Sequence, residues 1–211
     1  MAPDIAFSST LFIHALVGVF VIVNPFGNVP IFISLTQKFT PVERRNAIVK
    51  SVVIATAILL VFALIGKVLF DFLNVTIDSL RIAGGLLLLA IAFDMLMGRS
   101  PASRIEPDEE RESVAVTPMA TPLLAGPGAM TTVMILMNEA DTPVLKGSIL
   151  LAILLAMGAT LLILINCDWV YSAIKKDGAR VLTKIMGIVL ATIAVEMIVN
   201  GVLHAFPALG V

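Results

Sequence analysis

The stretch SSTLFIHALVGVFVIVNPFGNVPIFISLT, residues Ser8–Thr36, decides the fold. Its 29 residues are almost all apolar. As one straight helix they would extend roughly 43 Å, against about 30 Å of bilayer hydrocarbon. Pro25 removes an amide donor near the middle and disfavours helix at the residue before it. We therefore predict two half-helices, Ser8–Val23 and Val29–Thr36, joined by an unwound segment, Asn24–Asn28.

The remaining chain has the composition of a membrane protein. Its 211 residues are 59% apolar and 14% charged, with a mean hydropathy of +1.04. A soluble domain is about 45–50% apolar and about 25% charged, so the surface must face lipid. The single Cys167 excludes an intrachain disulfide and a Cys-rich metal site. No Lys or Arg precedes Lys38, so we expect the first apolar run to be a retained span rather than a signal peptide.

Six apolar stretches approach the ~20 residues that a membrane-spanning helix needs. They are residues 8–36, 47–70, 77–97, 114–137, 144–167 and 181–206. Polar connectors separate them at residues 37–46, 71–76, 98–113, 138–143 and 168–180. We expect an all-α membrane protein with six transmembrane helices and no soluble domain.

The two halves of the chain resemble each other in order. NPFGNVP in the first span corresponds to TPLLAGPG in the fourth, and IAFDM (Ile91–Met95) in the third corresponds to IAVEM (Ile193–Met197) in the sixth. Three spans per half force the second half to be inverted, and paired broken helices in inverted repeats are typical of secondary transporters. We predict two inverted three-helix repeats, residues 1–97 and 114–211, with helices 1 and 4 discontinuous and a charged cytoplasmic connector at 98–113.

Lys and Arg residues are distributed unevenly between the two sides. Eleven lie in or beside the first, third and fifth connectors, and three lie on the opposite side. Cytoplasmic loops carry the excess of Lys and Arg. We therefore expect the cytoplasmic membrane as the location, with multiple passes and both termini non-cytoplasmic.

The two proline-rich breaks are the candidate binding site. Unwound backbone in hydrocarbon is tolerated only where protein packs around it or where it lines a cavity. Amides at a half-helix N-terminus attract an anionic group, and carbonyls at a C-terminus attract a cation. Neither span has an ionised side chain in its core, which suits a net-neutral zwitterion. The alternative is that the prolines simply kink continuous helices.

Two acids within predicted spans are candidates for ion coupling. Glu196 lies near the centre of the sixth span, where a carboxylate is costly and suggests a function; a protonated or hydrogen-bonded structural Glu is the alternative. Asp94 lies nearer a span end and can simply reach interfacial water. His14 is more typical of a packed core residue than of a proton relay.

Several of these segments resemble the MarC family of membrane proteins: Val23–Thr36 most specifically, then Arg81–Leu96, Thr121–Met130 and Met186–Gly201. The resemblance covers nearly the whole chain. It implies six spans related to amino-acid exporters of the LysE type, with members that transport glycine and alanine, and discontinuities in spans one and four. The candidate substrate-binding residues are Asn24, Pro25, Phe26, Gly27, Asn28, Thr121, Pro122, Gly126, Pro127 and Gly128.

The leading hypothesis is a secondary transporter of small neutral amino acids that works by alternating access and is coupled to a proton or sodium gradient. The alternative is a passive channel, or an exporter of a drug, a small ion or another small solute on the same scaffold. An intramembrane enzyme is least favoured, because the chain has no HExxH, GxSxG or nucleotide motif. We expect no catalytic residue, metal or cofactor, no nucleic-acid partner, and as partners the substrate, a coupling ion and the bilayer. The sequence leaves the oligomeric state, the transport direction and the alternating-access state open.

Overall fold

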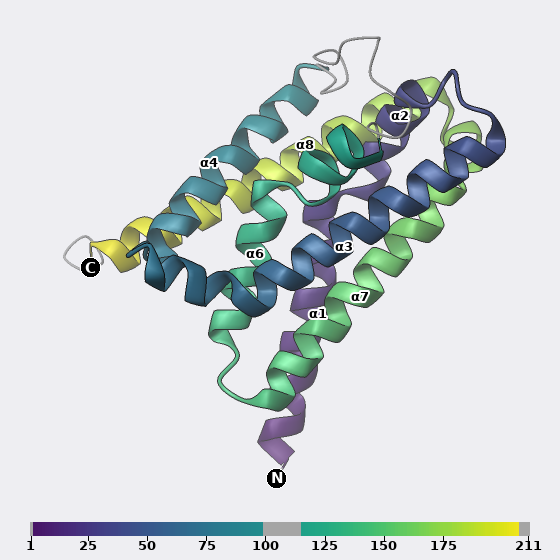
Figure 1. Ribbon diagram of the computed structural model, residues 1–211. Coiled ribbons are helices and arrows are strands. Elements are labelled where there is room, and N and C mark those ends of the chain that lie inside the picture. Colours follow the sequence, from purple (N-terminus) through teal and green to yellow (C-terminus); the bar gives the residue numbers. More distant parts are fainter. Residues whose placement is uncertain (1, 99–114, 207–211) are drawn as a thin grey trace.

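The computed structural model describes residues 2–98 and 115–206, and these form helices joined by short turns, with no strand among them (Figure 1). The elements are α1 (Ala2–Val23), α2 (Pro25–Leu35), α3 (Pro41–Phe72), α4 (Ile77–Leu96), η2 (Ala115–Leu124), α6 (Pro127–Glu139), α7 (Pro143–Ile165) and α8 (Cys167–Ala205). The predicted connector at 98–113 lies almost wholly outside the described residues.

Five helical stretches are long and apolar enough to cross a membrane, and a sixth is obtained if the bent pair η2 and α6 is counted as one span. Four of the five match the predicted spans closely, and the first, Thr10–Leu35, includes both α1 and α2. The chain is therefore a multi-spanning all-helical protein.

Proline and threonine set the helix starts. Pro25, Pro41, Pro127 and Pro143 each stand in the first turn, where the missing N–H costs nothing and φ is already suitable. Thr40 caps α3 and forms a reciprocal capping box with Glu43. Each of these prolines therefore follows a break or a turn and begins the next helix.

The first break is narrower than predicted. Asn24 alone is non-helical, and Pro25 begins α2 at once, so the expected unwound segment Asn24–Asn28 and half-helix Val29–Thr36 are both wrong in extent. Asn tolerates the left-handed conformation that Asn24 adopts, with φ 51° and ψ 59°. A single residue is therefore enough to redirect the chain.

The polar connector predicted at 168–180 is helical. It continues as helix within α8, which runs unbroken from Cys167 to Ala205. No proline interrupts this polar stretch, and a polar composition outside the hydrocarbon does not oppose helix formation. Only its second part, Arg180–Ala205, is apolar enough to span.

The helices pack as two arms. α4 and α8 lie side by side along their length, and α1, α3 and α7 form the other group (Figure 1). η2 and α6 pack against α3, and α6 also contacts α1 and α4. Glycine permits the close approach of α4 to α8, since a Cβ on Gly85 would meet the Ala194 carbonyl oxygen at 2.7 Å. Small residues of this kind let helices approach closely within lipid.

Candidate functional site

The break between α1 and α2 is held by two buried asparagines. The Gly27 N–H donates to Asn24 Oδ1 at 3.2 Å instead of to the Val23 carbonyl four residues back. The Asn28 Nδ2 donates to that Val23 carbonyl at 2.9 Å. The two side chains thus replace the backbone bond that the left-handed residue breaks, and each satisfied group avoids a penalty of about 1–3 kcal/mol.

The second break lies between η2 and α6, whose axes are bent by 54°. Thr117 and Thr121 have extended backbone within η2, and the Thr121–Pro122 peptide bond is cis. Gly126 is the N-cap of α6 and makes no side-chain capping bond. In α2, α3 and α7, which also begin with proline in the first turn, the N-cap side chain does accept such a bond. The first amides of α6 are therefore not occupied by a cap side chain.

A cavity of about 1030 Å³ lies between the two breaks. Residues of α1, α2, α4, η2, α6 and α8 line it, and six of the ten predicted binding residues are among them: Asn24, Gly27, Asn28, Pro122, Gly126 and Gly128. Pro25, Phe26, Thr121 and Pro127 are not part of the lining. Phe26 instead packs edge-on against Phe20, with ring centroids 6.2 Å apart.

The buried part of the cavity lining is largely apolar, with small residues at the two breaks and two buried side-chain amides. Asn24 and Asn28 are 5% and 6% exposed. Among the described residues, the Asn24 Nδ2 donates to the Met95 sulfur alone, at 3.5 Å, and a thioether is a weak acceptor. That amide therefore keeps donor capacity for a ligand in the cavity.

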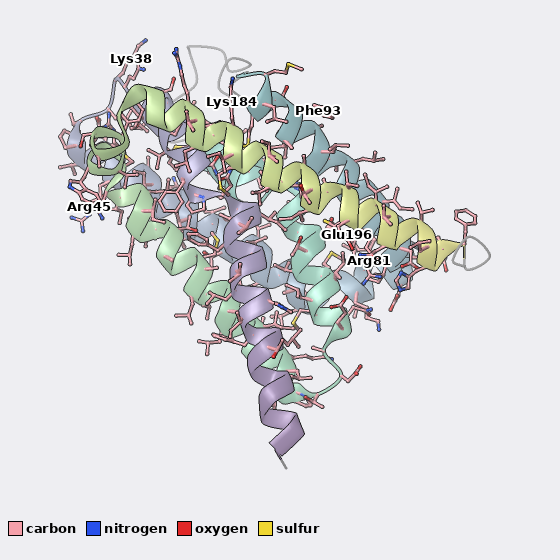
Figure 2. The ribbon with its side chains drawn as sticks, turned by 180° about the vertical axis from the view of Figure 1, so that it is seen from behind. Lys38, Arg45, Arg81, Phe93, Lys184 and Glu196 are labelled. Atoms are coloured by element: carbon pink, nitrogen blue, oxygen red, sulfur yellow. The ribbon has the colours of Figure 1, made fainter. Side chains whose placement is uncertain are left out.

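The mouth of the cavity is polar and charged. Met97, Gly98, Arg180 and Lys184 are exposed and line it at one end of the molecule, the end at which Figure 2 shows Lys38 and Lys184. Asp94 is half-buried and belongs to the same lining. The sequence analysis gave Asp94 as a candidate for ion coupling that can also simply reach interfacial water, and it did not include Arg180 or Lys184. All three lie towards span ends, so only the tertiary fold brings them to this cavity.

Glu196 lies elsewhere. It is exposed and lines a separate cavity of about 550 Å³ with Arg81, Glu139 and His204. Its Oε1 accepts a hydrogen bond from Asn200 Nδ2 at 3.0 Å. The structure therefore does not bring Glu196 to the two breaks.

An ion pair ties the helices together beside the mouth of the larger cavity. Arg44 on α3 donates to Asp168 on α8 at 2.8 Å and to the Thr36 carbonyl at the end of α2 at 3.1 Å. Burial raises the pKa of the neighbouring Cys167 thiol, and the Asp168 carboxylate adds to this, while Arg44 opposes it. The thiol is thus neutral near pH 7 and a poor nucleophile.

None of the described residues forms a group of three or more His, Cys, Asp and Glu side chains that could hold a metal ion. What the geometry offers is a solute-sized cavity between two interrupted helices. These features define a class: a multi-spanning helical membrane protein with a cavity between the Asn24 kink and the bend that separates η2 from α6.

Comparison with known proteins gives the family. Residues 9–206 match the MarC family integral membrane proteins, and the chain belongs to that family. It is 45% identical over 195 residues to the UPF0056 membrane protein MJ1677 of Methanocaldococcus jannaschii, covering 90% of this chain and 95% of that one. It is 32% identical to YvbG of Bacillus subtilis, covering 93% and 96% of the two chains, and 30% identical to YhcE of Escherichia coli, covering 96% and 97%. No solved structure matches.

Proposed function

We propose that this protein is a secondary transporter of small neutral amino acids, of the glycine and alanine class, in the cytoplasmic membrane. The observation that carries the proposal is that both interrupted spans line one cavity, with Asn24 on one wall and Gly128 on the other. Broken helices facing each other across a cavity are the usual substrate site of secondary transporters.

The α6 N-terminus supports recognition of a carboxylate. Gly128 and Ala129 follow Pro127 in the first turn of α6 and line the cavity. Amides at an uncapped helix N-terminus, together with the helix dipole, favour an anionic group. The Asn24 amide supplies a further donor. The last residues of α1 and η2, among them Val23 and Leu124, line the same cavity, where helix C-terminal carbonyls favour an ammonium.

The packing of the helices supports two inverted repeats, residues 1–97 and 114–211. If spans one, two and three are exchanged with four, five and six, the main pairs of helices in contact are reproduced, whereas the slight contacts of α7 with α6 and with α8 are not matched to the same extent. The first span packs on the fifth as the fourth packs on the second, and the third packs on the fourth as the sixth packs on the first. Such symmetry gives two related arrangements of one chain, which alternating access needs.

Uptake of labelled glycine and alanine into proteoliposomes tests the proposal. We expect saturable uptake above that of empty liposomes, with accelerated exchange when the lumen contains unlabelled substrate.

Gly128→Val should abolish this uptake, because a Cβ there already meets Leu88 Cδ1 at 2.9 Å. Gly158→Ala is the matched control, since nothing lies within 4 Å of its Cβ. Uptake equal to empty liposomes for every small amino acid would reject the function, and uptake without exchange acceleration would indicate a passive channel.

Imposed proton and sodium gradients test the coupling. Asp94 lines the larger cavity and Glu196 the smaller one, so both are candidates for a coupling site. Asp94→Asn and Glu196→Gln are compared for the pH dependence of uptake. A variant whose pH dependence matches that of the parent has no part in proton coupling.

A further inference from the structure

The smaller cavity lies between α4, α6 and α8, and none of its lining residues lines the larger one. Figure 2 shows Arg81 and Glu196 towards the C-terminal end of α8, far from Lys184 and Lys38. The two cavities thus open at different ends of the same three elements.

A packed layer separates them. A Cβ on Gly84 would meet the Thr131 side chain at 2.5 Å, and one on Gly85 would meet the Ala194 carbonyl oxygen at 2.7 Å. Thr131 is 3% exposed. α4 therefore closes directly on α6 and α8 between the cavities.

The smaller cavity carries opposite charges on its walls. Arg81 NH2 on α4 pairs with Glu139 Oε1 on α6 at 2.8 Å, and Arg81 NH1 lies 3.4 Å from Asp78 Oδ1. Glu196 on α8 completes the ring, with Asn200 donating to its Oε1. His204 Nδ1 lies 2.6 Å from the Asn200 carbonyl oxygen; because a carbonyl only accepts, Nδ1 carries the proton there.

We propose that this smaller cavity is a vestibule that binds the zwitterionic solute before it reaches the larger cavity. The solute carboxylate replaces Glu139 on Arg81, and its ammonium pairs with Glu196. The solute class rests on the proposed function.

The chemistry of the side chains favours this ligand. The guanidinium fork of Arg81 binds carboxylates in a directed, bidentate way, and Glu139, whose side chain is 48% exposed, is solvated when it is displaced. Two carboxylates, Glu139 and Asp78, lie against Arg81, and a third, Glu196, lines the same cavity, so a simple anion is repelled. A zwitterion overcomes that repulsion because it brings its own ammonium to Glu196.

Displacing Glu139 also has a structural consequence. The Arg81–Glu139 pair joins α4 to the end of α6, and α6 begins at the wall of the larger cavity with Gly128. Solute binding at Arg81 breaks this tie between the two helices. Binding of the solute in the vestibule therefore releases the contact that holds α4 to α6 at this end of the molecule.

Thiol protection in detergent solution tests the vestibule independently of membrane orientation. In a Cys167→Ser background, Ile135→Cys places a thiol in the lining of the smaller cavity, and Asp141→Cys places a control in the exposed turn after α6. At roughly ten times its Kd, glycine should slow maleimide modification of Ile135→Cys about tenfold, with Asp141→Cys unaffected. N-acetylglycine and glycine ethyl ester, which each lack one charge, should not protect. No protection by glycine, or equal protection by N-acetylglycine, would overturn the proposal.

A pair of variants assigns the ammonium partner. Glu196→Gln leaves the Arg81–Glu139 pair in place and should abolish protection, whereas Thr192→Ala in the same lining should retain it. Retained protection in Glu196→Gln overturns the assignment of the ammonium to Glu196. If glycine crosses the liposome membrane but does not protect Ile135→Cys from the maleimide, the vestibule proposal is wrong and the proposed transport function stands. If glycine protects the thiol but does not cross the membrane, the proposed transport function is wrong and the binding site stands.

Discussion

At Asn24 the backbone turns left-handed and yet loses little hydrogen bonding. The Asn24 N–H still reaches the Phe20 carbonyl at 3.0 Å, and the Asn24 carbonyl still accepts from the Asn28 N–H at 3.1 Å. The bond between Gly27 and Val23 is lost, and the Asn24 and Asn28 side chains replace it. Pro25 has no N–H to donate to the Val21 carbonyl. The first break is therefore a buried kink, bridged by two asparagines, that leaves a side-chain amide facing the cavity.

Substitutions at Asn24 separate its two contributions. Asn24→Gly keeps the positive φ without steric cost but removes the cap, whereas Asn24→Ala removes the cap and adds the left-handed penalty of about 1–2 kcal/mol. We therefore expect the melting temperature of Asn24→Ala to be lower than that of Asn24→Gly, and both to be lower than that of the parent protein. Thermal unfolding followed by size-exclusion chromatography measures these temperatures. Equal melting temperatures for the two variants would show that residue 24 does not keep φ near 51°.

At the scale of the elements, the packing of α4 against α8 depends on glycines, which have no side chain. A Cβ on Gly85 would meet backbone, the Ala194 carbonyl oxygen at 2.7 Å, and one on Gly201 would meet the Asp78 carbonyl oxygen at 2.9 Å. Backbone cannot rotate away as a flexible side chain can, so a methyl group there must push the helices apart.

Gly85→Ala and Gly158→Ala test this contact. Gly85→Ala should destabilise by the ~1–3 kcal/mol typical of overpacking. Gly158→Ala meets nothing within 4 Å and should be neutral, or more stable by up to about 1 kcal/mol through helix propensity. Chemical or thermal unfolding in detergent gives both values. A Gly85→Ala protein as stable as Gly158→Ala would contradict the close approach of α4 and α8.

Sequence reasoning located the spans because apolar run length is a local signal, and the prolines marked the two places where the structure has a left-handed residue, Asn24, and the bend between η2 and α6. It misjudged the extent of the first break, since the bonds of Asn24 and Asn28 that allow helix to resume at Pro25 depend on side-chain geometry. It identified six residues of the larger cavity, because all six flank the prolines. It missed the Arg81–Glu139 pair, whose partners are 58 positions apart and meet only through the packing of α4 on α6.

At the scale of the whole molecule, the two ends differ in the cavity that each one carries. The mouth of the larger cavity lies at the end with Lys38 and Lys184, and the smaller cavity lies towards the other (Figure 2). A single conformation that is open at one end and closed by a packed layer towards the other is what the proposed alternating-access transport requires of one of its states. Which state it is depends only on the orientation of the chain in the membrane.

Labelling in cells measures that orientation. The excess of Lys and Arg predicts that Lys38 lies in the cytoplasm and that Asp141, in the turn between α6 and α7, lies outside; both residues are exposed. In a Cys167→Ser background, an impermeant maleimide should modify Asp141→Cys in intact cells and Lys38→Cys only after permeabilisation. The larger cavity then faces the cytoplasm, and the Arg81–Glu139 pair is the closed outer gate. The reverse labelling pattern would make the same structure outward-open and would place the vestibule on the cytoplasmic side.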